Sequence, residues 1–342
     1  MTSMRRIAKT IAIKSGGLGL YHRLTHREHL TVLMFHRVLP GHLMAPYAVD
    51  DEYAISTALL ERLIKFVSAN YNVVGLDDVL RSRRKEAPLP PLPLLVTFDD
   101  GWDDNAIHGA PVLAASRIPW TLFAATDAIS SGERWWQEVL LAALRTGNAS
   151  YRQLWGQAAD ESHPAADKGT DPVLAILLLY GALPPAKRDA LLTRYLDTIS
   201  MQVTPRHMAN WDTLRALQKS GVGIGGHGAS HLPLTMLADP ATDLKQAQSI
   251  MRQQLGETAC STISFPHGRY SPAIADTARA LGTELLFTSD PTLNKCRGGW
   301  LESDLVGRIS ISTAAVADGR GVLDMERAMP WLMLRQASEF SA

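Results

Sequence analysis

Two pairs of side chains in this sequence have the types and the spacing of a hydrolytic metal site. Asp99 and Asp100 are adjacent carboxylates, and His227 and His231 are histidines four residues apart beside several glycines. One carboxylate and two imidazoles make a three-ligand site for a transition metal with room for water, and a second carboxylate could deprotonate that water. The residues therefore indicate metal-assisted hydrolysis, without showing which aspartate binds the metal and which acts as the base.

Simpler interpretations exist for each segment. The run Asp99–Gly101 could be a solvated turn after a strand. A formal GxGxxG lies at Gly221–Gly226, but a dinucleotide site needs these glycines between a strand and a helix. Here the glycines overlap the expected strand, and Pro233 follows soon after, so we disfavour dinucleotide binding.

Segments with strand character precede both pairs. The apolar run 94–98 ends directly before Asp99, and the run 222–225 ends shortly before His227. Parallel α/β sheets place their chemistry at these carboxyl ends. We expect strands at 31–35, 71–75, 94–98, 120–125, 222–225, 262–265, 285–288 and 308–312, and helices at 57–67, 77–84, 110–116, 211–219, 239–255 and 272–281. This alternation predicts the α/β class, as a distorted (β/α)7-type barrel with helices outside.

The alternation stops in the middle of the chain, where helical patterns follow one another without a strand. Trp135 and Trp136 open this run. They could stack on sugar rings, but a place in a hydrophobic core is the favoured interpretation. The predicted organisation is a basic N-terminal extension at 1–30, a first barrel part at 31–132, an inserted helical subdomain at 133–206 with helices at 139–144, 173–179 and 187–196, and a second barrel part at 207–342.

Composition sets broad limits on the function. The chain has 342 residues, of which 46% are hydrophobic, and 34 basic residues balance 34 acidic ones. This composition is typical of a globular protein. Because the net charge is zero, the chain as a whole does not attract the negatively charged nucleic acids, and we predict no nucleic-acid partner. The two cysteines, Cys260 and Cys296, form no CxxC, which favours a cytoplasmic location.

The first 27 residues are the exception to this charge balance. They carry Arg5, Arg6, Lys9, Lys14, Arg23 and Arg27 and no acidic residue. The segment is a poor signal peptide and is too short and too charged to span a bilayer. A disordered leader is the favoured interpretation, and contact with an anionic membrane, at its inner face, is a weaker hypothesis.

The motifs resemble those of the polysaccharide deacetylases, the NodB-like carbohydrate esterases. Thr97–Gly101 matches the first family motif, and His227–His231 matches the histidine spacing of the second, with Gly228 where a serine or threonine is usual. The correspondence covers about residues 31 to 130 and 207 to 312. The resemblance implies that Asp99 is the general base and that Asp100, His227 and His231 hold a divalent metal, most often zinc.

Two further segments resemble family motifs with departures. Ser264–Tyr270 resembles the third motif, with His267 in place of an aromatic residue, and in the family a backbone N–H here helps to bind the oxyanion. Leu33–Val38 resembles the opening tyrosine-histidine segment, so we expect His36 to face the site.

The general acid is the weakest part of the resemblance. The C-terminal segment 305–311 lacks the histidine that many members use there, so His36, His267 or a proton returned through Asp99 remain open as the acid. Arg308 in this segment could orient Asp99, as an arginine does in relatives, but an exposed arginine at a strand edge is the favoured interpretation.

The predicted function is metal-dependent removal of N-acetyl groups from a polysaccharide or glycan precursor, so the expected partner is an N-acetylated glycan. Deformylation or amide hydrolysis on a smaller or lipid-linked sugar is the alternative within enzymes. A catalytically silent glycan-binding member of the fold is the alternative outside them.

Overall fold

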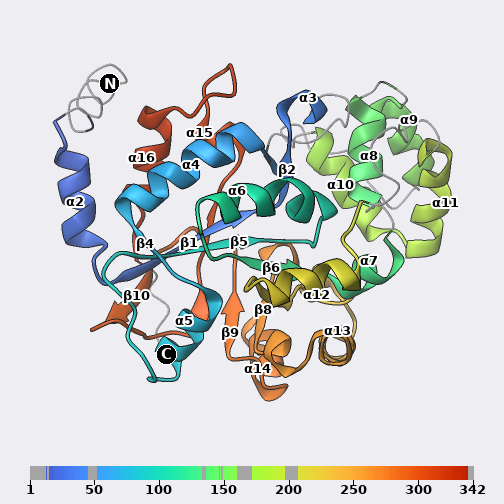
Figure 1. Ribbon diagram of the computed structural model, residues 1–342. Coiled ribbons are helices and arrows are strands. Elements are labelled where there is room, and N and C mark those ends of the chain that lie inside the picture. Colours follow the sequence, from blue (N-terminus) through green and yellow to red (C-terminus); the bar gives the residue numbers. More distant parts are fainter. Residues whose placement is uncertain are drawn as a thin grey trace. The chain divides into compact units, whose positions relative to one another are not determined.

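Two units make up the chain in the computed structural model (Figure 1). The structure describes residues 13, 15–44, 52–132, 136–145, 147, 149–159, 172–196 and 207–337. Unit 1 comprises Met1–Pro40, Asp51–Gly132 and Met208–Ala342, and unit 2 comprises Gly41–Asp50 and Glu133–His207. Residues 133–135, which open the predicted insertion and include Trp135, lie outside the described residues.

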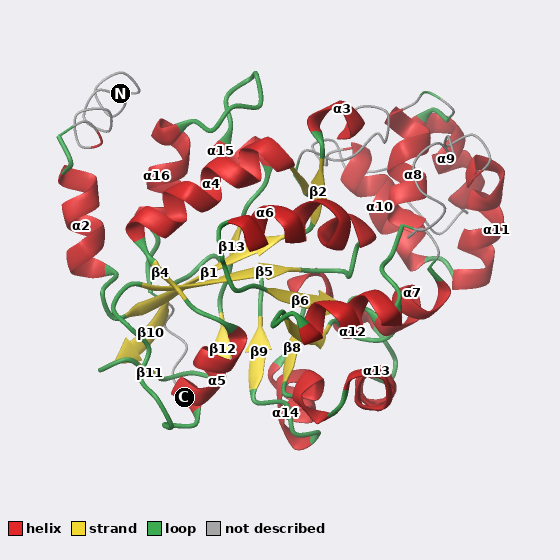
Figure 2. Cartoon of the chain, in the orientation of Figure 1, coloured by secondary structure: helices red, strands yellow, loops and turns green. Residues whose placement is uncertain are grey.

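A curled sheet with helices around it forms the centre of unit 1, as the strand–helix alternation predicts (Figure 2). Neighbouring strands pair in parallel along the order β1-β5-β6-β7-β8-β9-β12. The strands are β1 (His29–Phe35), β2 (Arg37–Leu39), β3 (Ala54–Ser56), β4 (Asn72–Val73), β5 (Pro93–Phe98), β6 (Thr121–Ala124), β7 (Gly223–Gly226), β8 (Thr262–Ser264), β9 (Leu285–Phe287), β10 (Asn294–Arg297), β11 (Trp300–Leu301), β12 (Leu305–Val306) and β13 (Ile309–Ser310).

A broken strand joins the two edges of this curled sheet. β12 pairs with β9, β13 pairs with β1, and only Gly307 and Arg308 separate β12 from β13. The short segment therefore bridges β9 and β1, and this closure is what makes the fold a distorted barrel. The predicted fold class is confirmed.

Helices surround the sheet in unit 1 and form most of unit 2. A representative case is α4, where the Ser56 side chain caps the helix by accepting from the Leu59 N–H, a bond worth about 1 kcal/mol. The helices are α2 (Gly17–Thr25), α3 (Gly41–Met44), α4 (Thr57–Asn70), α5 (Leu76–Arg83), η1 (Asn105–Gly109), α6 (Ala110–Ala115), α7 (Thr126–Ser131), α8 (Trp136–Arg145), α9 (Tyr151–Ala158), α10 (Pro172–Ala182), α11 (Pro185–Leu196), α12 (Trp211–Lys219), η2 (Leu234–Met236), α13 (Pro240–Leu255), η3 (Glu257–Cys260), η4 (Pro266–Gly268), α14 (Pro272–Ala280), α15 (Thr313–Val316) and α16 (Met325–Met333).

Helix α2 corrects the interpretation of the N-terminus as a disordered leader. Residues 17–25 form a helix, and its Leu18 and His22 side chains are buried. The His22 ring lies 4.5 Å from that of Tyr71 and 4.8 Å from that of His26, measured between centroids. Residues 1–12 and 14 of the predicted extension lie outside the described residues. No described helix is long and apolar enough to cross a membrane.

Unit 2 has a hydrophobic core of its own, built by α8 to α11. Trp136 packs against this core, and the Arg188 guanidinium lies 4.8 Å from the centre of its ring. This agrees with the core interpretation of the tryptophan. Helix α9 was not expected; its Ser150–Gln153 capping box is the local signal for its start.

Candidate metal centre

The two pairs of predicted residues meet at one edge of the sheet. Asp99 and Asp100 follow β5, His227 follows β7, and β6 lies between these strands. Because parallel strands end on the same side, their carboxyl ends bring the side chains together. Asp100, His227 and His231 each offer a ligand atom within 4.8 Å of the others, and all three side chains are buried.

The distances within this group fit a bound metal ion. Asp100 Oδ1 lies 3.3 Å from His227 Nε2 and 3.4 Å from His231 Nε2. Both separations are long for charge-assisted hydrogen bonds. They match the spacing of about 3.3–3.6 Å between neighbouring ligand atoms around a tetrahedral ion with bonds of about 2.0–2.2 Å. The donor set of one carboxylate and two imidazoles therefore suits zinc.

The backbone selects the tautomer of His227. Its Nδ1 lies 2.7 Å from the Ser264 carbonyl oxygen, so Nδ1 carries the proton and donates it there. The lone pair of Nε2 is then free to face Asp100. This is the usual outer hydrogen bond of a metal-binding histidine.

Arg308 holds Asp99, which overturns the favoured view of this arginine as an exposed strand-edge residue. It is 0% exposed and points from the break between β12 and β13 to Asp99. Its Nη1 and Nη2 donate to Asp99 Oδ1 and Oδ2 at 2.7 Å each, and the Ser264 hydroxyl donates to Oδ2 at 3.0 Å. The carboxylate is thus fixed in a bidentate fork.

These neighbours keep both carboxyls ionised. Burial raises the pKa of Asp99, but the charges of Arg308 and His227 outweigh burial and leave the pKa below its usual value. Burial also raises the pKa of Asp100, but its contacts with His227 and His231 hold that pKa well below the usual value. A bound metal would require both histidines to be neutral, and two carboxylates would then face one arginine, a net negative charge that favours a cation.

Trp102 fixes the remaining oxygen of Asp100. Its indole Nε1 donates to Asp100 Oδ2 at 2.8 Å, so Oδ1 alone is left to face the histidines. The Arg37 guanidinium covers the indole at 4.4 Å from the ring centre, and Arg37 pairs with buried Asp104 at 2.8 Å. None of these three residues has a role predicted from the motifs.

This contact predicts a metal-affinity defect for Trp102→Phe. The variant keeps a ring beneath Arg37 but removes the N–H that orients Asp100, so we expect zinc binding to weaken by about ten- to hundredfold. Competition with a chromophoric chelator measures the affinity. The matched control is Trp331→Phe in α16, which removes an indole N–H that donates to the Ser310 carbonyl oxygen of β13. Equal zinc affinity in both variants would show that the indole does not orient the ligand.

The loop that carries the two histidines depends on a glycine and on Asp243. Gly228 has φ +71°, and an added Cβ would lie 3.0 Å from Asp243 Oδ1, so the departure from the family motif at this position fits the local backbone. Asp243 accepts from the Ala229 and Ser230 N–H groups at 2.8 and 2.9 Å. No local sequence signal marked Asp243, which lies in the first turn of α13.

His36 and His267 lie around the candidate centre. His36 is partly exposed, and its ring lies 5.2 Å from that of Tyr53, measured between centroids. The His267 ring lies 4.6 Å from that of His231, and its Nε2 lies 3.2 Å from the His231 carbonyl oxygen. The His267 backbone N–H donates to no group of the described residues, so it can serve an oxyanion.

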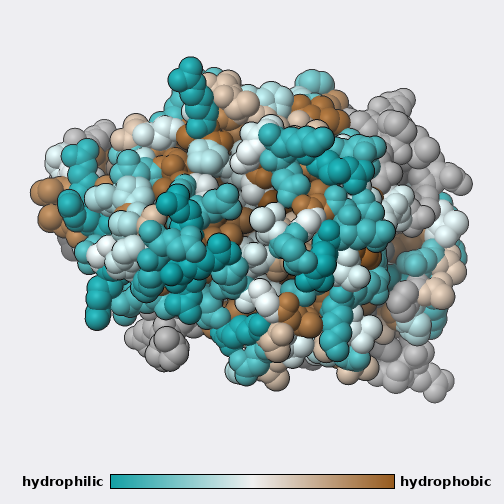
Figure 3. All heavy atoms as spheres, turned by 60° about the horizontal axis from the view of Figure 1, so that its bottom comes forward, coloured by the Kyte–Doolittle hydropathy of each residue, from teal (hydrophilic) through white to brown (hydrophobic). Residues whose placement is uncertain are grey.

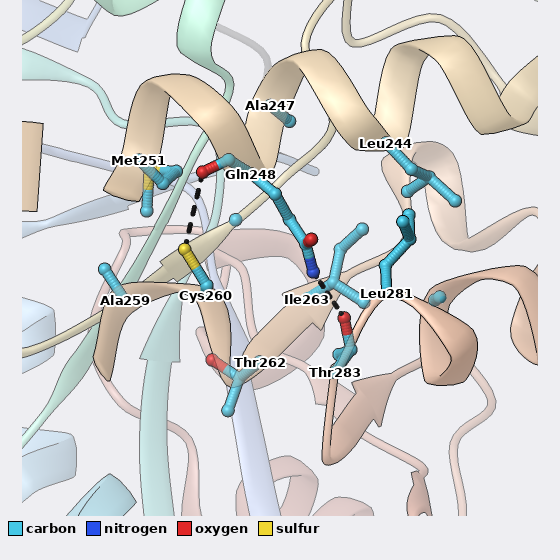
Figure 4. A pocket seen from close by; sticks show the side chains of 12 residues that line it. Leu244, Ala247, Gln248, Met251, Ala259, Cys260, Thr262, Ile263, Leu281 and Thr283 are labelled. Carbon is cyan, nitrogen blue, oxygen red and sulfur yellow. Dashed lines mark hydrogen bonds between the residues drawn. The ribbon is translucent and has the colours of Figure 1, made fainter. Parts of the chain in front are cut away.

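A small cavity elsewhere in unit 1 is separate from this group (Figure 4). Its walls include Leu244 and Met251 of α13, Cys260 and Ile263, and none of the six predicted site residues lines it. Gln248 donates to the Thr283 hydroxyl across it at 3.1 Å. The cavity is mostly apolar and brings no cluster of reactive groups together.

Comparison with known proteins agrees with the motifs. The polysaccharide deacetylase family model matches residues 188–286, which include His227 and His231 but not Asp99 and Asp100. No curated protein matches the sequence.

Solved structures share the fold at low identity. IcaB from Ammonifex degensii is 18% identical with a TM-score of 0.56, over 90% of this chain and 97% of that one. The deacetylase PplD from Streptococcus pyogenes is 13% identical with a TM-score of 0.53, over 83% and 92%. A de-N-acetylase from Aggregatibacter actinomycetemcomitans is 16% identical with a TM-score of 0.52, over 82% and 94%.

The chain thus shares its fold with solved deacetylase structures, and its residues 188–286 match the polysaccharide deacetylase family model. The resemblance to the polysaccharide deacetylases that the motifs indicate agrees with both comparisons.

Proposed function

We propose that this protein is a metal-dependent hydrolase that removes N-acetyl groups from a glycan. The observation that carries the proposal is the buried triplet Asp100, His227 and His231 beside an ionised Asp99 that Arg308 fixes from a separate segment. A silent glycan-binding member of the fold would have no use for these buried charged groups, because burying charge is costly. This argues against the non-enzymatic alternative.

Each side chain has a role in the proposed reaction. Asp100, His227 and His231 would hold the ion, which when bound would acidify water and polarise the amide carbonyl. Asp99 accepts the proton of the attacking water, and its lowered pKa means that it is ionised at neutral pH. Arg308 then stabilises the orientation of Asp99, and the His267 N–H supports the developing oxyanion.

The departing amine also needs a proton, and His36 is the better supported donor. Its partly exposed ring is accessible from solvent and interacts electrostatically with both carboxylates. In His267, by contrast, one ring nitrogen already faces the carbonyl oxygen of His231. Return of the proton from Asp99 is the remaining route.

An N-acetylated sugar is the proposed substrate because the structural relatives include a de-N-acetylase. The substrate could be a polymer or a lipid-linked precursor. The proposed location is the cytoplasm, since Cys260 and Cys296 are both free thiols. Recovery of the protein from the exported fraction of cells would contradict that location.

The test is product release from a panel of glycans. Purified protein loaded with zinc is incubated with N-acetylated and N-formylated oligosaccharides and with a lipid-linked N-acetylated sugar, and acetate and formate are quantified. We expect acetate from at least one N-acetylated sugar. Formate alone would favour the deformylase alternative, and binding without either product would favour the silent one.

A further inference from the structure

The outer face of helix α2 is apolar although it is exposed to solvent. Leu20, Tyr21 and Leu24 are 61%, 46% and 72% exposed, and their spacing places them on one side of the helix. Figure 3 shows hydrophobic atoms at the left edge of the molecule, the side on which α2 lies in Figure 1. Covering the barrel requires only one apolar face of α2. The second apolar face therefore indicates a binding partner.

The opposite face of the helix is already occupied. Leu18 and His22 are buried, and α2 packs against α16. Burial lowers the pKa of His22 to about 4, so its ring stays neutral at physiological pH, as a packed side chain requires. The outer face therefore cannot be covered by turning the helix inward, because that would expose the buried face instead.

Positive charge surrounds the apolar side chains. Arg23 and Arg27 are exposed and form no ion pair with any described residue. The sequence from Met1 to Arg27 contains six basic residues and no acidic one, while the whole chain is neutral. The positive charge is therefore local to this end of the chain and complements a negatively charged surface.

We propose that the outer face of α2, formed by Leu20, Tyr21, Leu24 and Arg23, together with Arg27 just beyond the end of the helix, binds the surface of an anionic phospholipid bilayer. Leucine side chains inserted between headgroups, with arginines at the phosphate level, are the arrangement of a helix lying in the membrane interface. A nucleic acid would use the arginines but not the exposed leucines. This peripheral attachment goes beyond the proposed hydrolysis and does not depend on it.

Vesicle co-sedimentation of the full chain tests the proposal. The probes are vesicles of phosphatidylcholine alone and of phosphatidylcholine mixed with phosphatidylglycerol. Wild type should bind the anionic vesicles and release them at high salt. We expect the partition coefficient to fall by at least about tenfold in Leu20→Ser/Leu24→Ser and by about ten- to thirtyfold in Arg23→Gln/Arg27→Gln.

Matched controls distinguish binding through this face from nonspecific adsorption to vesicles. Ile107→Ser/Met236→Ser removes exposed apolar side chains elsewhere, and Arg297→Gln/Arg320→Gln removes exposed charges elsewhere. Both should bind like wild type, and thermal melting should show that all variants fold.

Three results of the sedimentation experiment would overturn the proposal: no binding of wild type to anionic vesicles, unchanged binding of the leucine variant, or equal losses in the controls. Light scattering without vesicles provides an independent check on the occupant. A wild-type oligomer that dissociates in the leucine variant would assign the face to a second copy of the chain instead.

Discussion

Replacing Asp99 by asparagine is expected to reduce acetate release by about a hundred- to ten-thousandfold while zinc binding persists. The carboxylate accepts from both Nη atoms of Arg308 and lies outside the group Asp100, His227 and His231 that offers ligands. Asparagine keeps the shape and one acceptor for Arg308 but cannot take a proton from water. Initial rates and zinc stoichiometry of the same preparation measure both properties.

Asp100→Asn is the informative partner of this variant, because it should lose zinc and activity together. Asp212→Asn, at a position that is 89% exposed, is the surface control and should behave like wild type. The division of roles between the adjacent aspartates would be reversed if Asp99→Asn lost zinc and Asp100→Asn retained it. Substantial activity in zinc-loaded Asp99→Asn would remove Asp99 as the base.

His227→Ala should have the largest effect on the metal. The ring supplies Nε2 to the centre, and its Nδ1 is held by the Ser264 carbonyl oxygen, so removal takes away a ligand that is already oriented. We expect zinc affinity to fall by more than the ten- to hundredfold typical of an outer partner, and acetate release to be lost at limiting zinc. Calorimetric zinc titration measures the affinity.

In the protein without metal, His227→Ala also removes the ring that pairs with the Asp99 and Asp100 carboxylates. Asp99 and Asp100 raise the pKa of His227 against the effect of burial, so this ring is their partner when no ion is bound. His42→Ala, at an exposed histidine, is the control for loss of an imidazole. Zinc affinity like that of His42→Ala would show that His227 is not a ligand.

The strand ends could be predicted because the sequence signal is local. The apolar run before Asp99 becomes β5, whose six residues are all buried, and the run before His227 becomes β7. Their placement at one edge follows from the parallel sheet. The fold class and the residue types were therefore enough to predict that Asp100 lies close to the two histidines.

Arg308, Trp102 and Asp243 could not be predicted in their roles, because each acts through tertiary contacts. In the sequence, Arg308 resembles an exposed residue at a strand edge. In the structure, the break between β12 and β13 directs its side chain inward to Asp99. Asp243 reads as an ordinary acidic residue near a helix start, and its partners lie in the histidine loop. Helix α2 was missed because its apolar residues follow two adjacent glycines, which resemble a flexible leader.

The most direct test of the central claim is removal and restoration of the metal. Protein stripped with chelator is assayed for acetate release on its best N-acetylated glycan, before and after one equivalent of zinc is added. The proposed site predicts loss of acetate release on stripping and its recovery in wild type but not in His227→Ala. Undiminished release by the stripped protein, with no zinc detectable in it, would contradict a metal-dependent deacetylase.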